Sequence, residues 1–231
     1  MPECGFVAEY LKLRGSEGRV YPDEWVRCLP HMPRGGAHAS EWRLRARSAR
    51  RLRHYLGQRT PLRLLEVGCG NGWLSHYLSL LPGTEVLGID INGPELGQAR
   101  RLFVRPNLSY RQTTLEDLSA GSFDCILFAA SFQYFSGVPA LLDACFRRLV
   151  RGGSVHIIDT HFYPTQKRAA ARDRSAAYFA RQNAVTMERY YQHHSFEELD
   201  AYHFRLCNPF SDRLRRLGGT VFPWIQIERP S

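Results

Sequence analysis

The chain has 231 residues, of which 44% are apolar, 23% charged and 12% aromatic. This composition is that of a globular protein and excludes a disordered, collagenous or coiled-coil chain. At roughly 100–200 residues per domain, the length favours one large domain with appendages over two independent enzymes. The longest apolar stretch, around Cys125–Phe132, is well short of the ~20 residues that span a bilayer. Since the first residues also lack a secretory signal, we expect a soluble, cytoplasmic chain with no membrane span.

Arginine dominates the charged residues. The chain carries 31 Lys and Arg against 22 Asp and Glu, for a net charge of +9, yet only Lys12 and Lys167 are lysines. That preference is typical of codon bias, while the excess charge also suits a nucleic-acid partner, so the charge leaves the partner open. The six cysteines form neither a Cys-x-x-Cys pair nor a Cys/His cluster at zinc spacing. We therefore expect reduced thiols and no metal.

Three unequal parts follow one another along the chain. Residues 1–40 are an irregular preface rich in aromatic residues, Gly and Pro, which we expect to act as a lid. From 41 to 160, short apolar runs alternate with helix-period segments, which predicts βαβ units around a parallel sheet. We assign one domain to 41–231, in which residues 161–219 form a covering insertion of helical and irregular structure. The closing run Thr220–Glu228 is predicted to complete the sheet as a strand hairpin.

Glu41–Leu56 is predicted to be an amphipathic helix. Trp42, Ala46, Ala49, Leu52 and Leu56 recur at three- and four-residue steps, while the arginines of Arg43–Arg53 occupy the other faces. A helix packed on a sheet with a solvated arginine face needs no ligand. A helix that faces RNA has the same pattern, so both interpretations stay open.

The segments that follow predict an open α/β sheet with helices on both faces. Phe123–Ala130 is an almost continuous apolar run, as expected for a strand buried on both sides. The predicted strands are 62–67, 85–89, 107–112, 123–130 and 155–159. The predicted helices are 73–81, 94–103 and 138–150, the last one stopped by Gly152 and Gly153.

The most informative segment reads Leu-Leu-Glu-Val-Gly-Cys-Gly-Asn-Gly over residues 64–72. A glycine-rich turn between a strand and a helix lets the backbone approach a ligand closely, at the sheet edge where open α/β proteins bind ligands. A dinucleotide fingerprint would need glycine where Trp73 stands, and a P-loop would need a lysine that is absent. A turn that binds pyrophosphate is therefore disfavoured.

The pattern Glu-x-Gly-x-Gly-x-Gly, followed by Asp90 at the end of the next strand, resembles the class I S-adenosylmethionine-dependent methyltransferases. The resemblance covers about residues 41–160 and part of the last strand. It implies a Rossmann-like, doubly wound, mostly parallel seven-stranded sheet and S-adenosylmethionine as cofactor, with S-adenosylhomocysteine as product.

The resemblance also implies residue roles. Asp90 would accept the ribose hydroxyls, Ile91 would cover one face of the adenine, and Glu66 would interact with the α-ammonium. Thr114 stands where the family often has Asp. The remaining implied contacts come from the turn, from the segment after the third strand and from the end of the fourth: Gly68, Cys69, Gly70, Gly72, Leu115, Glu116 and Ala130.

Candidate catalytic groups lie after the fourth strand and in the covering insertion. Tyr134 follows that strand, and His193 and His194 lie in a Tyr-rich segment before Ser195–Leu199, which is predicted to begin a helix. A histidine with a pKa near neutrality suits deprotonation of a hydroxyl or amine, although adjacent histidines in such a segment are as often structural.

The sequence favours a small-molecule acceptor with an oxygen or nitrogen nucleophile. The Asn/Asp-Pro-Pro-Tyr signature and the Pro-Cys pair of nucleic-acid methyltransferases are absent after the fourth strand. Two alternatives remain: an RNA-modifying methyltransferase that uses the Arg43–Arg53 face, and a catalytically idle cofactor-binding partner protein.

Overall fold

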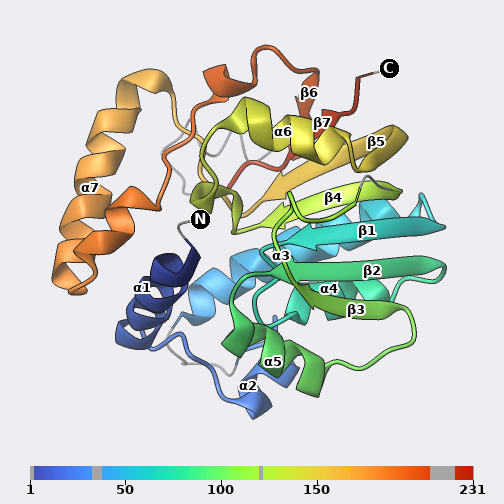
Figure 1. Ribbon diagram of the computed structural model, residues 1–231, viewed down its shortest axis with the longest axis horizontal. Coiled ribbons are helices and arrows are strands. Elements are labelled where there is room, and N and C mark those ends of the chain that lie inside the picture. Colours follow the sequence, from blue (N-terminus) through green and yellow to red (C-terminus); the bar gives the residue numbers. More distant parts are fainter. Residues whose placement is uncertain (1–2, 33–37, 120–121, 209–221, 231) are drawn as a thin grey trace.

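The computed structural model describes residues 3–32, 38–119, 122–208 and 222–230 (Figure 1). Within these ranges seven strands form one sheet, in the order β3-β2-β1-β4-β5-β7-β6. Neighbours from β3 to β5 pair in parallel, whereas β7 is antiparallel to both β5 and β6. The predicted doubly wound, mostly parallel, seven-stranded sheet is confirmed. The strands are β1 Leu62–Val67, β2 Thr84–Asp90, β3 Leu108–Gln112, β4 Phe123–Ala129, β5 Leu149–Ile158, β6 Phe204–Leu206 and β7 Ile225–Glu228.

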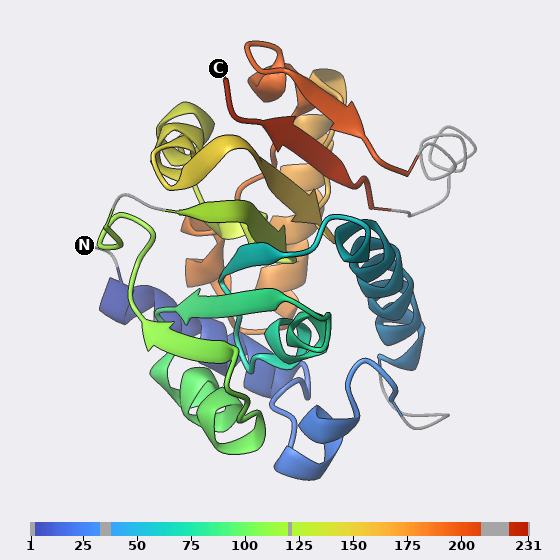
Figure 2. The ribbon, with the colours of Figure 1, turned by 90° about the vertical axis from the view of Figure 1, so that its right-hand side faces the viewer.

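Helices cover both faces of the sheet. Buried side chains of α3 and α4 pack on one face and those of α6 on the other, and Figure 2 shows α3 and α6 on opposite sides. The parallel strands β1, β2 and β4 point toward the side where α1 and α7 lie (Figure 1). Over the same described residues the α-helices are α1 Glu3–Ser16, α2 Asp23–Cys28, α3 Ala39–Gly57, α4 Trp73–Ser79, α5 Gly93–Leu102, α6 Val138–Phe146 and α7 Arg168–Arg181.

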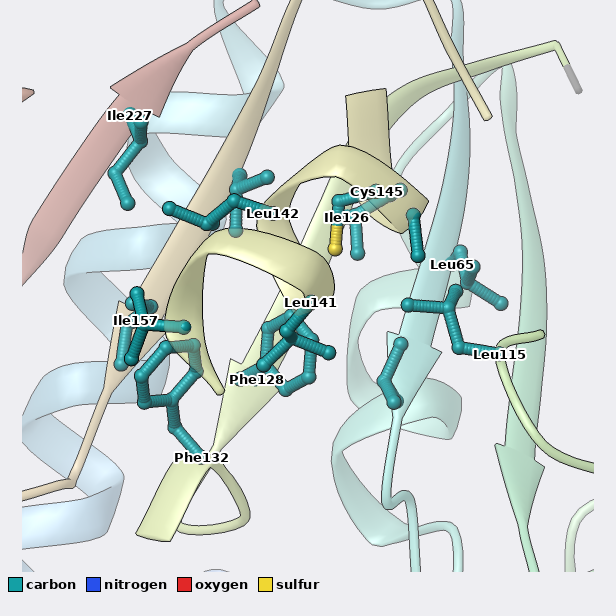
Figure 3. Close-up of a cluster of buried hydrophobic side chains, with 14 of the residues drawn as sticks. Leu65, Leu115, Ile126, Phe128, Phe132, Leu141, Leu142, Cys145, Ile157 and Ile227 are labelled. Carbon is teal, nitrogen blue, oxygen red and sulfur yellow. The ribbon is translucent and has the colours of Figure 1, made fainter. Parts of the chain in front are cut away.

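The largest apolar cluster lies between the sheet and α6 (Figure 3). Phe128, Phe132 and Leu142 are each fully buried there. Burial of a side chain of this size contributes roughly 1.5–3 kcal/mol, so this cluster holds the ends of β4 and β5 in a fixed relation.

The Gly152-Gly153 pair has a different role from the one predicted. The helix ends at Phe146, and β5 already begins at Leu149. Phe123 pairs with Leu149 but Cys125 pairs with Ser154, so β5 has extra residues between these pairs. Gly152 has a φ of 75°, which glycine adopts freely. The two glycines therefore lie in a bulge within a strand.

The N-terminal preface is helical over much of its length, which the expectation of an irregular segment missed. Leu13 of α1 is buried in a small cluster with Phe179, Ala184 and Met187. Those contacts come from far along the chain, so local periodicity does not reveal them.

Over its described residues, the covering insertion contains α7, short 3₁₀ turns and the strand β6, and this strand was not expected there. Phe196–Leu199 is a 3₁₀ turn and no α-helix begins there, which corrects the prediction at Ser195. The closing run enters the sheet as β7, but its hairpin partner β6 lies in the covering insertion, which corrects the prediction of a hairpin formed by Thr220–Glu228 alone. Thr220 and Val221 lie outside the described residues. Among the residues that the structure describes, no helix is long and apolar enough to cross a membrane.

A buried histidine joins β5 to β7. The Trp224 indole N–H donates to His156 Nδ1 at 3.0 Å, so Nδ1 is unprotonated, and Nε2 lies 3.0 Å from the Ser154 hydroxyl. Burial, with smaller contributions from Arg205 and Arg59, lowers the pKa of His156 to about 3. The ring is therefore neutral in the folded protein at neutral pH.

Acid should weaken the fold through His156. The unfolded histidine binds a proton below its usual pKa near 6.5, whereas the folded one stays neutral down to about 3. Protonation therefore favours the unfolded chain, and this group's contribution to stability falls by about 1.4 kcal/mol per pH unit as pH drops from 6.5 to 3. Denaturant unfolding of the native protein and of His156→Gln across this range measures the difference. Parallel curves for the two proteins would contradict the assignment.

Candidate functional site

Three glycines shape the turn between β1 and α4. Gly68, Gly70 and Gly72 all have positive φ angles, of 75°, 52° and 75°. The Gly68 N–H donates to the Ile89 carbonyl at 2.9 Å, which ties the turn to the end of β2. A Cβ on Gly68 would lie 2.6 Å from the Cβ of Ser131. The turn therefore requires glycine for its conformation and for its contact with the chain after β4.

The Asp90 carboxylate accepts hydrogen bonds from the turn after β1 and from the residues after β2. Its Oδ2 accepts the Gly70 N–H at 2.7 Å and its Oδ1 accepts the Asn92 N–H at 2.8 Å. Burial raises the pKa of Asp90, and these backbone donors partly oppose the rise. Since each carboxylate oxygen accepts more than one hydrogen bond, Asp90 keeps acceptor capacity for a ligand.

Glu66 is a second carboxyl group at the turn and is only 3% exposed. It accepts a hydrogen bond from the Ser75 hydroxyl. Burial is the main cause that raises the pKa of Glu66 to about 8. A cationic ligand group beside Glu66 would favour its ionised form.

The turn and the neighbouring strand ends surround two adjoining cavities. The first has an empty volume of about 1090 Å³, and Asp90, Ile91, Leu115 and Glu116 contribute to its wall. The other has an empty volume of about 690 Å³ and reaches Glu66, Cys69 and Asn71. The residues common to both are Tyr10, Gly68, Gly70, Glu95 and Ala130.

A third cavity, of about 1020 Å³, adjoins the first two at Ala130. Tyr134, Asp159 and Tyr163 line it, together with residues of α1 and α7. Ala130 and Asp159 stand directly after β4 and β5 and have positive φ angles of 54° and 56°. A positive φ angle costs of the order of 1–3 kcal/mol for a residue other than glycine. Two strained residues therefore lie where the cavities meet.

Helix α1 forms part of the wall of all three cavities. Phe6 and Tyr10 contact the Tyr134 ring, with centroids 5.3 and 5.7 Å away. Arg14 lines the second and third cavities and pairs with Glu17 at 3.0 Å. Helix α1 thus lies against these cavities, while a lid function of residues 1–40 stays a prediction.

Most of the residues implied by the resemblance come together here. Of the ten cofactor contacts, nine line one or both of the first two cavities. Gly72 does not line them; it precedes α4, and its carbonyl accepts the Tyr110 hydroxyl at 3.0 Å. Thr114, the departure from the family pattern, lines the first cavity, and its hydroxyl donates to Asp117 Oδ2 at 2.8 Å.

The two histidines lie outside the walls of these three cavities. The His194 ring nitrogens bond Glu198 and the Phe132 carbonyl at 2.9 and 3.1 Å, and the residue is 3% exposed. His193 Nε2 lies 2.8 Å from the Ser175 hydroxyl, and burial lowers the pKa of His193. These contacts are structural, so a direct catalytic role for either histidine stays a prediction. Tyr134 does line the cavities.

Two acidic residues of the site were not predicted. Asp159 ends β5 as Asp90 ends β2, so the same signal, an acid after an apolar strand, was available for it. Glu95 lies in the first turn of α5. An acid is common there because it stabilises the helix, so the sequence gives no separate signal that Glu95 lines a cavity.

Comparison with known proteins agrees with this geometry. Residues 65–157 match the family model described as "Methyltransferase domain". The chain is 36% identical over 101 residues to the ubiquinone biosynthesis O-methyltransferase of Xanthomonas oryzae pv. oryzae (strain PXO99A), which covers 41% of each chain. It is 36% identical over 103 residues to the enzyme of the same name from Cereibacter sphaeroides (strain ATCC 17025 / ATH 2.4.3), covering 43% of this chain and 41% of the relative. The match therefore spans about two fifths of these relatives' length.

Solved structures show the same fold over most of the chain. The plantazolicin methyltransferase BpumL, in complex with a triazolic desmethylPZN analog and SAH, covers 96% of this chain and 91% of its own, with a TM-score of 0.61 and 16% identity. Geranyl diphosphate C-methyltransferase from Streptomyces coelicolor A3(2) covers 73% of this chain and 70% of its own, with a TM-score of 0.54 and 16% identity.

The fold is that of the class I, Rossmann-like methyltransferases. Residues 65–157, about two fifths of the chain, match the Methyltransferase domain model and form the parallel part of this sheet.

Replacing Gly68 by Ala should destabilise the protein. The new Cβ meets Ser131 and the backbone keeps a positive φ, at a cost of about 1–3 kcal/mol in the free energy of unfolding. Gly97→Ala is the matched control, because no atom lies within 4 Å of a Cβ built there in the middle of α5. That control should gain about 0.5–1 kcal/mol. Chemical denaturation measures both, and equal stabilities would contradict the tight turn.

Proposed function

We propose that the chain is a methyltransferase that transfers the methyl group of S-adenosylmethionine to an oxygen or nitrogen of a small-molecule acceptor. One observation carries this proposal: the turn Gly68–Gly72, with Asp90 and Glu66 beside it, borders a cavity that meets a third cavity at Ala130. The proposed setting is the cytoplasm, which the free thiols of Cys69, Cys125 and Cys145 favour.

The donor and acceptor groups of the first two cavities fit the cofactor. Asp90 has acceptor capacity for ribose hydroxyls, while Ile91 and Leu115 offer apolar walls for an adenine ring. Glu66 suits the α-ammonium group, and the glycine turn leaves room for the methionine chain. When bound, the cofactor supplies a methyl group already activated by a sulfonium. The protein's part is then to orient the acceptor and exclude water.

The third cavity is the proposed acceptor site. The Ser48 hydroxyl donates to Asp159 Oδ1 at 2.7 Å, while Oδ2 has no protein partner among the described residues. Asp159 is 8% exposed and lines the second and third cavities. Tyr134 lines the first and third. We propose Asp159 and Tyr134 to hold or accept the acceptor's proton, with His193 and His194 as the further candidates named from the sequence.

The relatives support an oxygen acceptor without deciding it. The two curated relatives are named O-methyltransferases, whereas BpumL was solved with a desmethylPZN analog. Of the α3 arginines, Arg45 pairs with Glu41 at 2.8 Å and Arg53 stacks over the Tyr77 ring at 4.8 Å. These contacts use part of the face on which an RNA enzyme would depend, so the small-molecule proposal is preferred.

Asp90→Asn should weaken binding of S-adenosylmethionine and S-adenosylhomocysteine by at least about 100-fold, because the ribose hydroxyls lose a charged acceptor. Calorimetric titration measures this, with NAD as a ligand control. Asp143→Asn, at an exposed acid on α6, is the matched protein control and should bind normally. Near-native affinity in the Asp90 variant would remove the ribose assignment.

Incubation with methyl-labelled S-adenosylmethionine and a cell extract should place label in the small-molecule fraction. Asp159→Asn and Tyr134→Phe should reduce that label by a larger factor than they weaken cofactor binding, because both residues also line the third cavity. Label in the RNA fraction, with binding that weakens steeply as salt rises, would support the RNA-modifying alternative instead. Cofactor binding with no label in either fraction would support a catalytically idle protein.

A further inference from the structure

A second carboxylate lies near Asp90 in the wall of the first cavity. Glu95 lies in the first turn of α5 and lines both of the first two cavities at their junction. Its Oε2 would be 3.2 Å from a Cβ on Gly70, the residue whose N–H donates to Asp90. Both carboxylates therefore converge on the middle glycine of the turn.

One buried residue orients the two carboxylates. Asn92 is 2% exposed; its backbone N–H donates to Asp90 Oδ1 at 2.8 Å, and its side-chain amide donates to Glu95 Oε2 at 2.8 Å. An acid at this helix position usually accepts the backbone N–H of the capping residue. Here Asp90 already takes that N–H, so Glu95 is held toward the cavity.

Neither carboxylate has a basic partner within ion-pairing distance among the described residues. Arg14 reaches the same cavity, but its ion pair is with Glu17 at 3.0 Å. Glu95 Oε1 has no protein partner in the part of the chain that the structure describes. The two carboxylates therefore have lone pairs that accept no hydrogen bond from the protein and are available to a ligand that supplies donors.

Given the proposed function, we infer that Glu95 accepts one of the two ribose hydroxyls of the cofactor and that Asp90 accepts the other. A vicinal diol presents two adjacent donors, which matches two converging carboxylates. Asp90 alone already accepts two backbone N–H groups, so a second acid relieves it of one hydroxyl. Glu95 is thus a cofactor-binding residue and a determinant of selectivity for an intact ribose.

The test is calorimetric titration of the native protein, Glu95→Gln and Glu95→Met with S-adenosylhomocysteine at pH 8.5, each with and without EDTA. In the Gln variant the Asn92 amide takes the remaining oxygen, which leaves an N–H group where Oε1 was. Both variants should bind about 10-fold more weakly or worse, because a hydrogen bond to a charged acceptor is lost. Glu85→Gln, at an exposed acid at the other end of β2, is the matched control and should bind as the native protein does.

Analogues of S-adenosylhomocysteine that lack the 2′- or the 3′-hydroxyl identify the partner group. The native protein should lose affinity for both analogues, whereas Glu95→Gln should lose nothing further for one of them. S-Adenosylmethionine and S-adenosylhomocysteine should weaken by the same factor, since both carry the ribose.

Four results would overturn the inference. The first is unchanged S-adenosylhomocysteine affinity in both Glu95 variants with a lowered melting temperature, which would make Glu95 a helix-capping residue only. The second is weaker binding of S-adenosylmethionine alone, which would mean that the Glu95 charge acts on the sulfonium and not on the ribose. The third is loss of native binding in EDTA, which would indicate a bridging metal ion. The fourth is a native protein that binds neither cofactor form, and it alone overturns the proposed function as well.

Discussion

The hydrogen bond from the Gly70 N–H to Asp90 joins the turn after β1 to the end of β2, and the candidate site is built around it. It forms only because the turn is left-handed at Gly68, Gly70 and Gly72, which brings the backbone N–H groups of the turn close to β2. The chain after β4 then packs on the same turn, where the Ser131 hydroxyl donates to the Val67 carbonyl at 2.7 Å. Three strand ends are thereby held within hydrogen-bonding reach of one glycine turn.

A charged residue of the N-terminal segment forms an ion pair with α3. Glu41 of α3 accepts from Arg19 at 2.6 Å and from Arg45 at 2.8 Å, and these side chains are only partly exposed. Removing these charges from water costs free energy that offsets much of their Coulomb attraction. The ion pairs therefore contribute less to stability than to the specific geometry of the contact. They connect the segment after α1 to the helix before β1. Arg19 therefore serves to attach the N-terminal segment to α3, while Arg45 pairs with the same carboxylate from within that helix.

The sequence predicted the parts of the fold that depend on local signals. Buried strands are continuous apolar runs, and the glycine turn and Asp90 stand at the strand ends. The sequence therefore indicated the strand positions and most of the residues that line the first two cavities. Helix α1 was not, because Leu13 is buried by Phe179 and Met187, which are distant in sequence. Nor does a pair such as His193 and His194 reveal which ring nitrogens the fold will occupy with Ser175, Glu198 and a carbonyl. Tertiary partners decide such roles, and no spacing encodes them.

The bulge at Gly152 has a consequence for how this gene can change. Downstream of it, Val155 and Ile157 face α6 while His156 and Ile158 face α3. Because side chains alternate along a strand, loss of one codon at the bulge would exchange these two sets. The same change of strand register would carry Asp159 away from the third cavity. Loops elsewhere on the surface tolerate gain or loss of a residue, but here the length of the chain between Leu149 and Asp159 is itself under constraint, independently of which residues fill it.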